Sequence, residues 1–210
     1  MVEFEKERYY YEEDSVGCIL RIGWFALGGY SGATFIQNGG TVDVSGLGAL
    51  TLGANGGGYA EYIVRKGTTT VPQLIVGMAN GQGHGYLTVD GAEAEFITAD
   101  GMYLNNYLTN PLTTEKHTII NINHGGTLET KNFNTVSDNA NYTSPYPVIV
   151  NFNGGVLRSA AIWNAAFAAG ETKHVGKIAV YEDGLTIEIP QYGPTTQYTP
   201  IVAAGEGGIQ

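Results

Sequence analysis

The sequence predicts an all-β solenoid, in which the chain winds in stacked coils of about 24 residues. The stretches LTLGANGGGYAEYIVRKG (50–67) and LIVGMANGQGHGYLTVDG (74–91) align without gaps at an offset of 24 positions. A second repeat, a glycine turn followed by a β run, reads QNGGTVDV, NHGGTLET, NGGVLRS and EDGLTIEI, at 37–44, 123–130, 153–159 and 182–189. Short runs rich in β-branched and aromatic residues, bounded by Gly, Asn, Asp or Pro, complete the pattern.

Each coil is expected to hold three short strands and three turns. Runs such as TVDV and LTIEI place apolar residues at every second position, as strands with one buried side do. Stacking would bring matched residues of the two long stretches within about 4.8 Å on neighbouring coils. These matches are Leu50 with Leu74, Gly53 with Gly77, Gly57 with Gly81, Tyr62 with Tyr86 and Gly67 with Gly91. About seven or eight coils fit the chain, whereas propeller blades need about 40–50 residues and a β-sandwich does not predict a gap-free repeat.

Two segments interrupt the strand pattern. RSAAIWNAAFAAGE (158–171) is rich in alanine with apolar residues at helical spacing, so we expect a short helix or lateral loop that Gly170 ends. The polar stretch 131–148 contains Pro145 and Pro147 and is expected to form a long loop. Long loops are where solenoids commonly carry function.

Composition excludes several classes of protein. The 31 glycines among 210 residues are about twice the usual share and argue against a helical protein. Acidic residues outnumber basic ones 20 to 10, and the net charge of -10 disfavours binding to nucleic acid or to anionic membranes. The single cysteine, Cys18, allows neither an intrachain disulfide nor a CxxC metal site and is interpreted as a small buried hydrophobe.

The chain is expected to divide into three parts. Residues 1–32 form an acidic, tyrosine-rich segment interpreted as a cap, 33–193 hold the β repeats, and 194–210 are expected to continue in a longer protein. No secretory signal is recognisable at the start. The apolar stretch 17–29 is too short to span a bilayer and contains Arg21.

The glycine-turn repeats resemble a known family. The NGGT turns, the LxVGxxNGxGxGxLTVDG unit and the block NGGVLRSAAIWNAAFAAG…IAVYEDGLTIEI are similar to the autotransporter-associated β-strand repeats of bacterial surface proteins. The similarity covers about residues 33–190. It implies a right-handed parallel β-helix of the pectin-lyase-like type, export and a role at the cell surface. It assigns no catalytic residue, because the repeat pattern is structural.

The glycine-rich centre of 74–91 raises the question of a ligand loop. It lacks the GxxxxGK[ST] pattern of a phosphate loop, and strands are expected on both of its sides. Calcium-binding solenoid repeats carry Asp in a GGxGxDxUx turn, and Gly85 holds that position here. His84, between two glycines, is interpreted as an exposed turn residue. We assign no metal role to any of the four histidines, His84, His117, His124 and His174.

Four acids lie close together in sequence: Asp90, Glu93, Glu95 and Asp100. On a strand Glu93 and Glu95 would share a face, where two carboxylates can act as acid and base. The four acids together could also form an incidental calcium site. No GxSxG elbow occurs and few basic residues lie nearby, so a solvated acidic face is the favoured interpretation. Whether Asp90, Glu93 and Glu95 meet the 131–147 loop in one cleft stays open.

Aromatic rings on a solenoid can stack on sugars, and the chain has 14 tyrosines. Those expected in loops or termini are interpreted as cap or contact residues: Tyr9, Tyr10, Tyr11, Tyr142, Tyr146, Tyr192 and Tyr198. Asn141 begins a glycosylation sequon, which carries no meaning in the bacterial protein that the resemblance implies.

The sequence therefore predicts a structural or adhesive segment of an exported bacterial surface protein, located outside the cell or on its surface, without catalytic residues, cofactor or metal. Unpaired strand groups at the coil ends suggest self-association end to end, and cell-surface glycans are the second expected partner. No nucleic acid or membrane-spanning segment is expected. Two alternatives stay open: a carbohydrate-binding or carbohydrate-cleaving β-helix of the polysaccharide lyase or tail-spike kind, and a filament-forming subunit.

Overall fold

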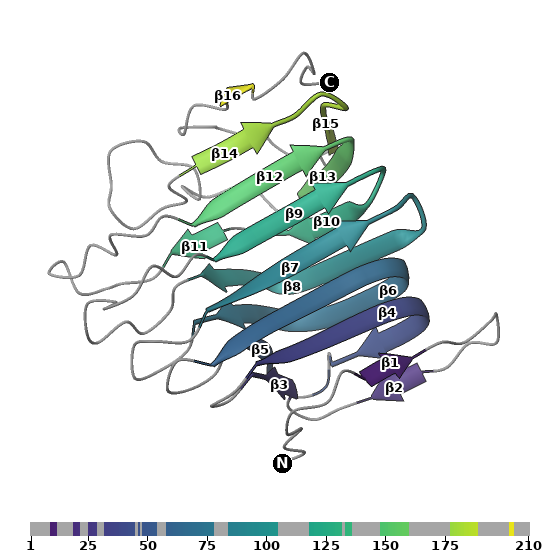
Figure 1. Ribbon diagram of the computed structural model, residues 1–210. Helices are drawn as coiled ribbons and strands as arrows, with labels where there is room; N and C mark the ends of the chain where they lie inside the picture. Colours follow the sequence, from purple (N-terminus) through teal and green to yellow (C-terminus); the bar gives the residue numbers. More distant parts are fainter. Residues whose placement is uncertain are drawn as a thin grey trace, which may run out of the picture.

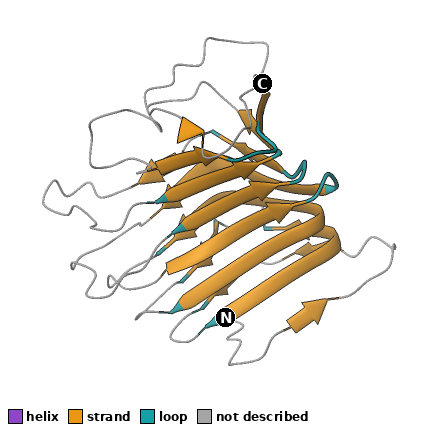
Figure 2. Cartoon of the chain, turned by 45° about the horizontal axis from the view of Figure 1, so that its top comes forward, coloured by secondary structure: helices purple, strands orange, loops and turns teal. Residues whose placement is uncertain are grey.

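The chain folds into a parallel β-solenoid (Figure 1). The computed structural model describes residues 9–11, 19–21, 25–28, 32–44, 46, 48–53, 58–77, 84–104, 118–131, 133–135, 148–159, 177–188 and 202–203. Sixteen strands form one sheet that winds around a core, and the described residues contain no helix (Figure 2). Neighbouring turns of the stack lie about 28 residues apart. The predicted fold class is confirmed, whereas the average spacing is longer than the predicted period of 24 residues.

Three ladders of parallel strands form three faces. The first face contains the N-terminal parts of β4 (Ala33–Asp43) and β6 (Tyr59–Val76), together with β1 (Tyr9–Tyr11), β7 (His84–Asp90), β9 (Ile119–Asn123), β12 (Ile149–Asn153), β14 (Lys177–Val180) and β16 (Val202–Ala203). The second face contains the following parts of β4 and β6, together with β2 (Ile19–Arg21), the start of β8 (Ala94–Leu104), β10 (Thr127–Thr130), β13 (Gly155–Ser159) and β15 (Leu185–Glu188). The third face contains β3 (Phe25–Leu27), β5 (Ala49–Leu52), the ends of β6 and β8, and β11 (Phe133–Thr135).

The core fills the space between the three faces, because every second residue of each strand points inward. In β6 the fully buried residues include Tyr62 and Val64 on the first face, Val71 on the second, and Leu74 and Val76 on the third. One continuous strand thus supplies core residues to all three faces. Neighbouring coils add residues of the same kind at the same register, so the core runs along the whole stack.

The offset between neighbouring coils differs from face to face. On the third face Leu50 pairs with Leu74, 24 positions on, as predicted. On the first face Tyr62 pairs with Leu87, 25 positions on, and the predicted match with Tyr86 is wrong. The extra residue enters between the two faces, in a segment that includes residues outside the described part of the chain. Since side chains alternate between the two sides of a strand, this slip of one residue turns Tyr62 inward and Tyr86 outward.

A further slip occurs at the first corner, the turns between the first and second faces at 38–40, 65–67, 91–93, 124–126, 154 and 181–184. Gly67 pairs with Ala94, so its predicted match with Gly91 is also wrong. Gly67 has φ +91°, and a Cβ there would lie 2.2 Å from the carbonyl oxygen of Gly40 in the previous coil. Only glycine fits such a close backbone approach at positive φ. His124 is the one non-glycine residue with positive φ in the described part of the chain.

The second corner, between the second and third faces, shows the same slippage. Val71 pairs with Thr98, but Gln73 pairs with Gly101, so β8 carries one residue more than β6 at this corner. Pro72 lies at this irregularity, a position where a sheet tolerates a residue without a backbone N–H. Between β6 and the next coil the offset is thus 25 positions on the first face, 27 on the second and 28 on the third.

A small hydrogen-bonded group lies inside the apolar core. The Tyr62 hydroxyl lies 3.0 Å from Thr69 Oγ1 and donates to Gln37 Oε1 at 3.3 Å. Thr69 Oγ1 donates to the same oxygen at 2.5 Å, and Gln37 Nε2 donates to the backbone oxygens of Gly40 and Thr68. Burial raises the pKa of Tyr62 well above its usual value, although the hydrogen bond with Thr69 acts in the opposite direction. Polar groups that are buried without partners cost stability, and these side chains satisfy one another.

The interrupting segments differ from expectation where they are described. Strand β11 (Phe133–Thr135) lies within the predicted 131–148 loop and pairs with β8, because the third face continues there. Residues 158–159 of the predicted helix or loop end β13 instead. The remaining residues of both segments, except 131 and 148, lie outside the described part, as do Cys18, Gly57, Gly81, His117, Asn141, Tyr142, Tyr146, Gly170, His174, Tyr192 and Tyr198. Within the described residues, no helix has the length and apolar character to cross a membrane.

Candidate functional site

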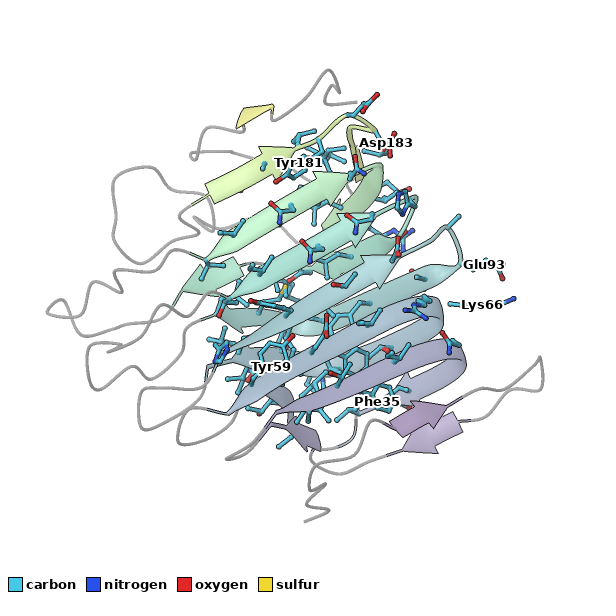
Figure 3. The ribbon with its side chains drawn as sticks, viewed as in Figure 1. Phe35, Tyr59, Lys66, Glu93, Tyr181 and Asp183 are labelled. Atoms are coloured by element: carbon cyan, nitrogen blue, oxygen red, sulfur yellow. The ribbon has the colours of Figure 1, made fainter. Side chains whose placement is uncertain are left out.

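The four acids that the sequence singles out lie apart, and each pairs with a basic residue of another coil. Figure 3 shows one such pair, Lys66 and Glu93, at the first corner. The pairs and their N–O distances are Lys66–Glu93 at 3.1 Å, His124–Asp90 at 2.6 Å, Lys131–Asp100 at 3.4 Å and Arg158–Glu95 at 2.6 Å. The acids therefore link different coils and do not converge on one point.

Glu93 and Glu95 do not share a strand face, so that prediction is wrong. The backbone N–H of Ala94 donates to the carbonyl oxygen of Gly91 and closes a turn before β8 begins. Glu93 consequently lies exposed in the first corner, where its side chain contacts Lys66 of the previous coil. Glu95 lies on the outer side of the second face, where Thr68 Oγ1 also donates to it at 3.4 Å.

His124 is the titratable group of the first corner that can change charge near neutral pH. Its Nδ1 lies 2.6 Å from Asp90 Oδ1 in the previous coil. The hydrogen bond to Asp90 raises the pKa of His124 above its usual 6.5, and the charges of Asp90 and Asp183 act in the same direction. Because the imidazole is exposed, this pair is a surface contact rather than a buried switch.

Arg158 forms the most connected ion-pair group in the described part of the chain. Its Nη1 donates to Glu95 Oε1 at 2.6 Å and to Glu129 Oε2 at 3.4 Å, and its Nε donates to Glu188 Oε2 at 2.6 Å. The four side chains, the Arg158 cluster, come from β8, β10, β13 and β15 of the second face. Hydrogen bonding to Glu188 is the main cause that raises the pKa of Arg158, and Glu95 and Glu129 add to it.

A polar ladder and an aromatic group occupy the outer side of the first face. Asn151 Nδ2 donates to Asn121 Oδ1 at 2.9 Å, and Asn121 Nδ2 donates to Thr88 Oγ1 at 3.3 Å, so one ladder connects three coils. Beside it the Tyr59 ring lies edge-on to Tyr86, with centroids 5.3 Å apart (Tyr59 is labelled in Figure 3). Burial raises the pKa of Tyr59 to about 12, and the nearby Glu61 and Tyr86 add to the shift.

His84 and Gly85 begin β7 and do not form a turn. The His84 side chain is half-buried, and its ring centroid lies 5.2 Å from that of Tyr59. The interpretation of His84 as an exposed turn residue is therefore wrong. Gly85 points into the core, where a Cβ would lie 2.8 Å from the Ala60 carbonyl oxygen and 3.0 Å from the Leu52 Cβ. An Asp at this position could not reach a surface ion. No group of three or more His, Cys, Asp or Glu side chains in the described residues is arranged to hold a metal.

Sequence reasoning missed Arg158, Glu129 and Glu188, although a signal for them was present. Aligning the second repeat places Glu129 of NHGGTLET beside Arg158 of NGGVLRS, and these residues pair in the structure. Arg158 in turn pairs with Glu188 of EDGLTIEI. The alternating charge along this register position was visible in the repeat. Tyr59 and Tyr86, which form the outer aromatic group, were not among the tyrosines that the sequence singled out as cap or contact residues.

Comparison of the chain with protein-family models, with curated proteins and with solved structures finds no match. The parallel β-solenoid is thus established by strand pairing alone.

Proposed function

We propose that this chain is a structural or adhesive segment of an exported bacterial surface protein, as its resemblance to autotransporter-associated repeats implies. The observation that carries the proposal is the arrangement of charge: each ion pair between described side chains joins two different coils. These pairs strengthen the contacts that keep coils stacked, which is what a stiff spacer requires.

The same arrangement argues against polysaccharide cleavage at the acids considered. Acid-base catalysis by two carboxylates needs both groups beside one glycosidic bond. Asp90 and Glu93 lie at the first corner with partners His124 and Lys66, and Glu95 lies on the second face with Arg158. Their positions favour a structural role for each carboxylate.

Two measurements on the purified chain test the proposal. We expect no release of reducing ends or unsaturated products from neutral or acidic polysaccharides, with or without calcium. Cleavage that Glu95→Gln abolishes and Thr70→Ala leaves intact would overturn the structural assignment. We also expect the sedimentation coefficient to rise with protein concentration, because copies of the chain associate end to end. Electron microscopy of the same sample then distinguishes short rods from the filaments of a filament-forming subunit. A species that stays monomeric at high concentration would count against assembly through coil ends.

Carbohydrate binding is the second candidate, and the outer side of the first face favours it. Tyr59 and Tyr86 supply rings, and the Thr88–Asn121–Asn151 ladder supplies hydrogen-bonding groups at the spacing of strands, about 4.8 Å. A sugar presents an apolar ring face and hydroxyl groups to such a surface. Affinity electrophoresis in gels that contain a polysaccharide tests this candidate. Binding that Tyr86→Ala weakens, and that Thr70→Ala on the second face does not change, would support it.

A further inference from the structure

Arg158 is the one described residue whose side chain is bonded to residues of three other coils. We infer that the Arg158 cluster is an electrostatic latch: it holds the coils of β12–β15 to the coils beneath them, and its release lets those coils open together while the rest of the stack stays closed. The inference concerns the chain itself and does not depend on the proposed function.

The hydrogen bonds of Arg158 extend beyond the adjacent coils. Repeat proteins are held mainly by contacts between adjacent repeats, so terminal repeats can open separately. Glu129 and Glu188 lie on the strands adjacent to β13, at the register position of Arg158. Glu95 lies one coil beyond β10, 63 positions from Arg158 in sequence, and still accepts a 2.6 Å hydrogen bond. The guanidinium thus couples coils that share no backbone pairing.

The cluster is also better shielded from solvent than the Lys66–Glu93 pair. Its side chains are 25–48% exposed, whereas Lys66 and Glu93 are 56% and 71% exposed. Partial burial preserves electrostatic attraction that water and salt weaken at exposed pairs. The forked guanidinium can also serve several carboxylates at once, which an ammonium cannot do with the same geometry.

Strand β15 depends on this contact because it has few others. Among the described strands it pairs with β13 only. Of its four residues, Thr186 and Glu188 are exposed and Leu185 is buried. The first face of the same coils is joined to β9 by backbone pairing and by the uncharged Asn151–Asn121 hydrogen bond. Loss of Arg158 therefore removes the charged contact that joins these coils to the stack.

Hydrogen exchange measured by mass spectrometry on the full chain tests the latch. For Arg158→Gln we expect amide exchange in all four strands β12–β15, β13 and β15 included, to rise about tenfold, because charge-assisted hydrogen bonds are lost, while exchange in β5 and β6 stays unchanged. Glu188→Gln, which removes an exposed partner and leaves the fold intact, should give a smaller rise at the same strands. Lys66→Met is the matched control, and we expect no change in β13 or β15.

The coupling to Glu95 has its own readout. Glu95→Gln alone should also accelerate exchange in β13 and β15, although it lies two coils away, and it should add nothing when Arg158 is already Gln. The result that overturns the latch is unchanged exchange in β13 and β15 for both Arg158→Gln and Glu188→Gln. A uniform rise over all strands, β5 and β6 included, would overturn it too, because Arg158 would then stabilise the whole stack and not these coils.

Discussion

At the scale of single residues, close packing of the backbone explains a glycine that the sequence had associated with a ligand site. Gly85, the residue at the centre of the calcium question, is needed because the Ala60 carbonyl oxygen and the Leu52 Cβ approach it inside the core. Gly85→Ala should lower the free energy of unfolding by about 1–3 kcal/mol, as expected for overpacking. The exposed Gly46, where an added Cβ would meet no atom within 4 Å, is the control. Gly46→Ala should change the free energy of unfolding by less than about 0.5 kcal/mol. Urea titration of both variants measures the difference.

His124 gives a residue-scale prediction about pH. Its pKa is raised in the folded state mainly by the hydrogen bond to Asp90. The pair therefore stabilises the fold below the unfolded pKa of about 6.5, and that contribution is lost as the pH rises through the folded pKa. Nuclear magnetic resonance titration of the imidazole should show a downward shift of this pKa in Asp90→Asn and a smaller one in Asp183→Asn. An unchanged titration in Asp90→Asn would contradict the pairing.

At the scale of elements, the sequence predicts strands and faces well but corners poorly. The runs YIVR, YLTV and LTIEI all lie in or overlap strands, because alternation of apolar residues reports burial directly. Tyr62 and Tyr86 align in the sequence repeat yet point to opposite sides, because one additional residue separates the faces. Glycine-rich corners carry no side-chain pattern from which such an insertion can be located. The same limit hid the true position of Glu93, which occupies a turn instead of a strand.

The opposite orientations of the two tyrosines can be tested by removing each hydroxyl group. Tyr62→Phe loses contacts to Thr69 and Gln37 inside the core, while Thr69 still donates to Gln37 Oε1. We expect the free energy of unfolding to fall by about 0.5–1.5 kcal/mol. Tyr86→Phe, on the outer side of the neighbouring strand, should lower it by less than about 0.5 kcal/mol. Equal losses for the two variants would mean that the register is that of the gap-free repeat.

At the scale of the whole molecule, the candidate site was predictable in its residues but not in its partners. Asp90, Glu93 and Glu95 were visible as a group in sequence. Their cations come from residues 27 to 63 positions away, at distances in sequence set by the lengths of several corners. Those lengths had to be known before His124 could be placed beside Asp90, or Arg158 beside Glu95. Register thus determines both the core and the surface of this protein.

Removal of one coil tests this dependence on register. Val64 pairs with Val89, 25 positions on, so deletion of residues 64–88 joins Ile63 to Val89 with the inward and outward sides preserved. Deletion of 64–87, which has the 24-residue period of the sequence repeat, instead puts Thr88 at an inward position and turns Val89 outward. We expect the 25-residue deletion to keep a β-type circular dichroism spectrum and one cooperative unfolding transition, at a lower denaturant midpoint because a solenoid loses one interface. The 24-residue deletion should bind hydrophobic dyes and unfold without a cooperative transition. If both variants unfolded cooperatively at the same midpoint, the stack would tolerate either register, and the slip at the corners would not affect stability.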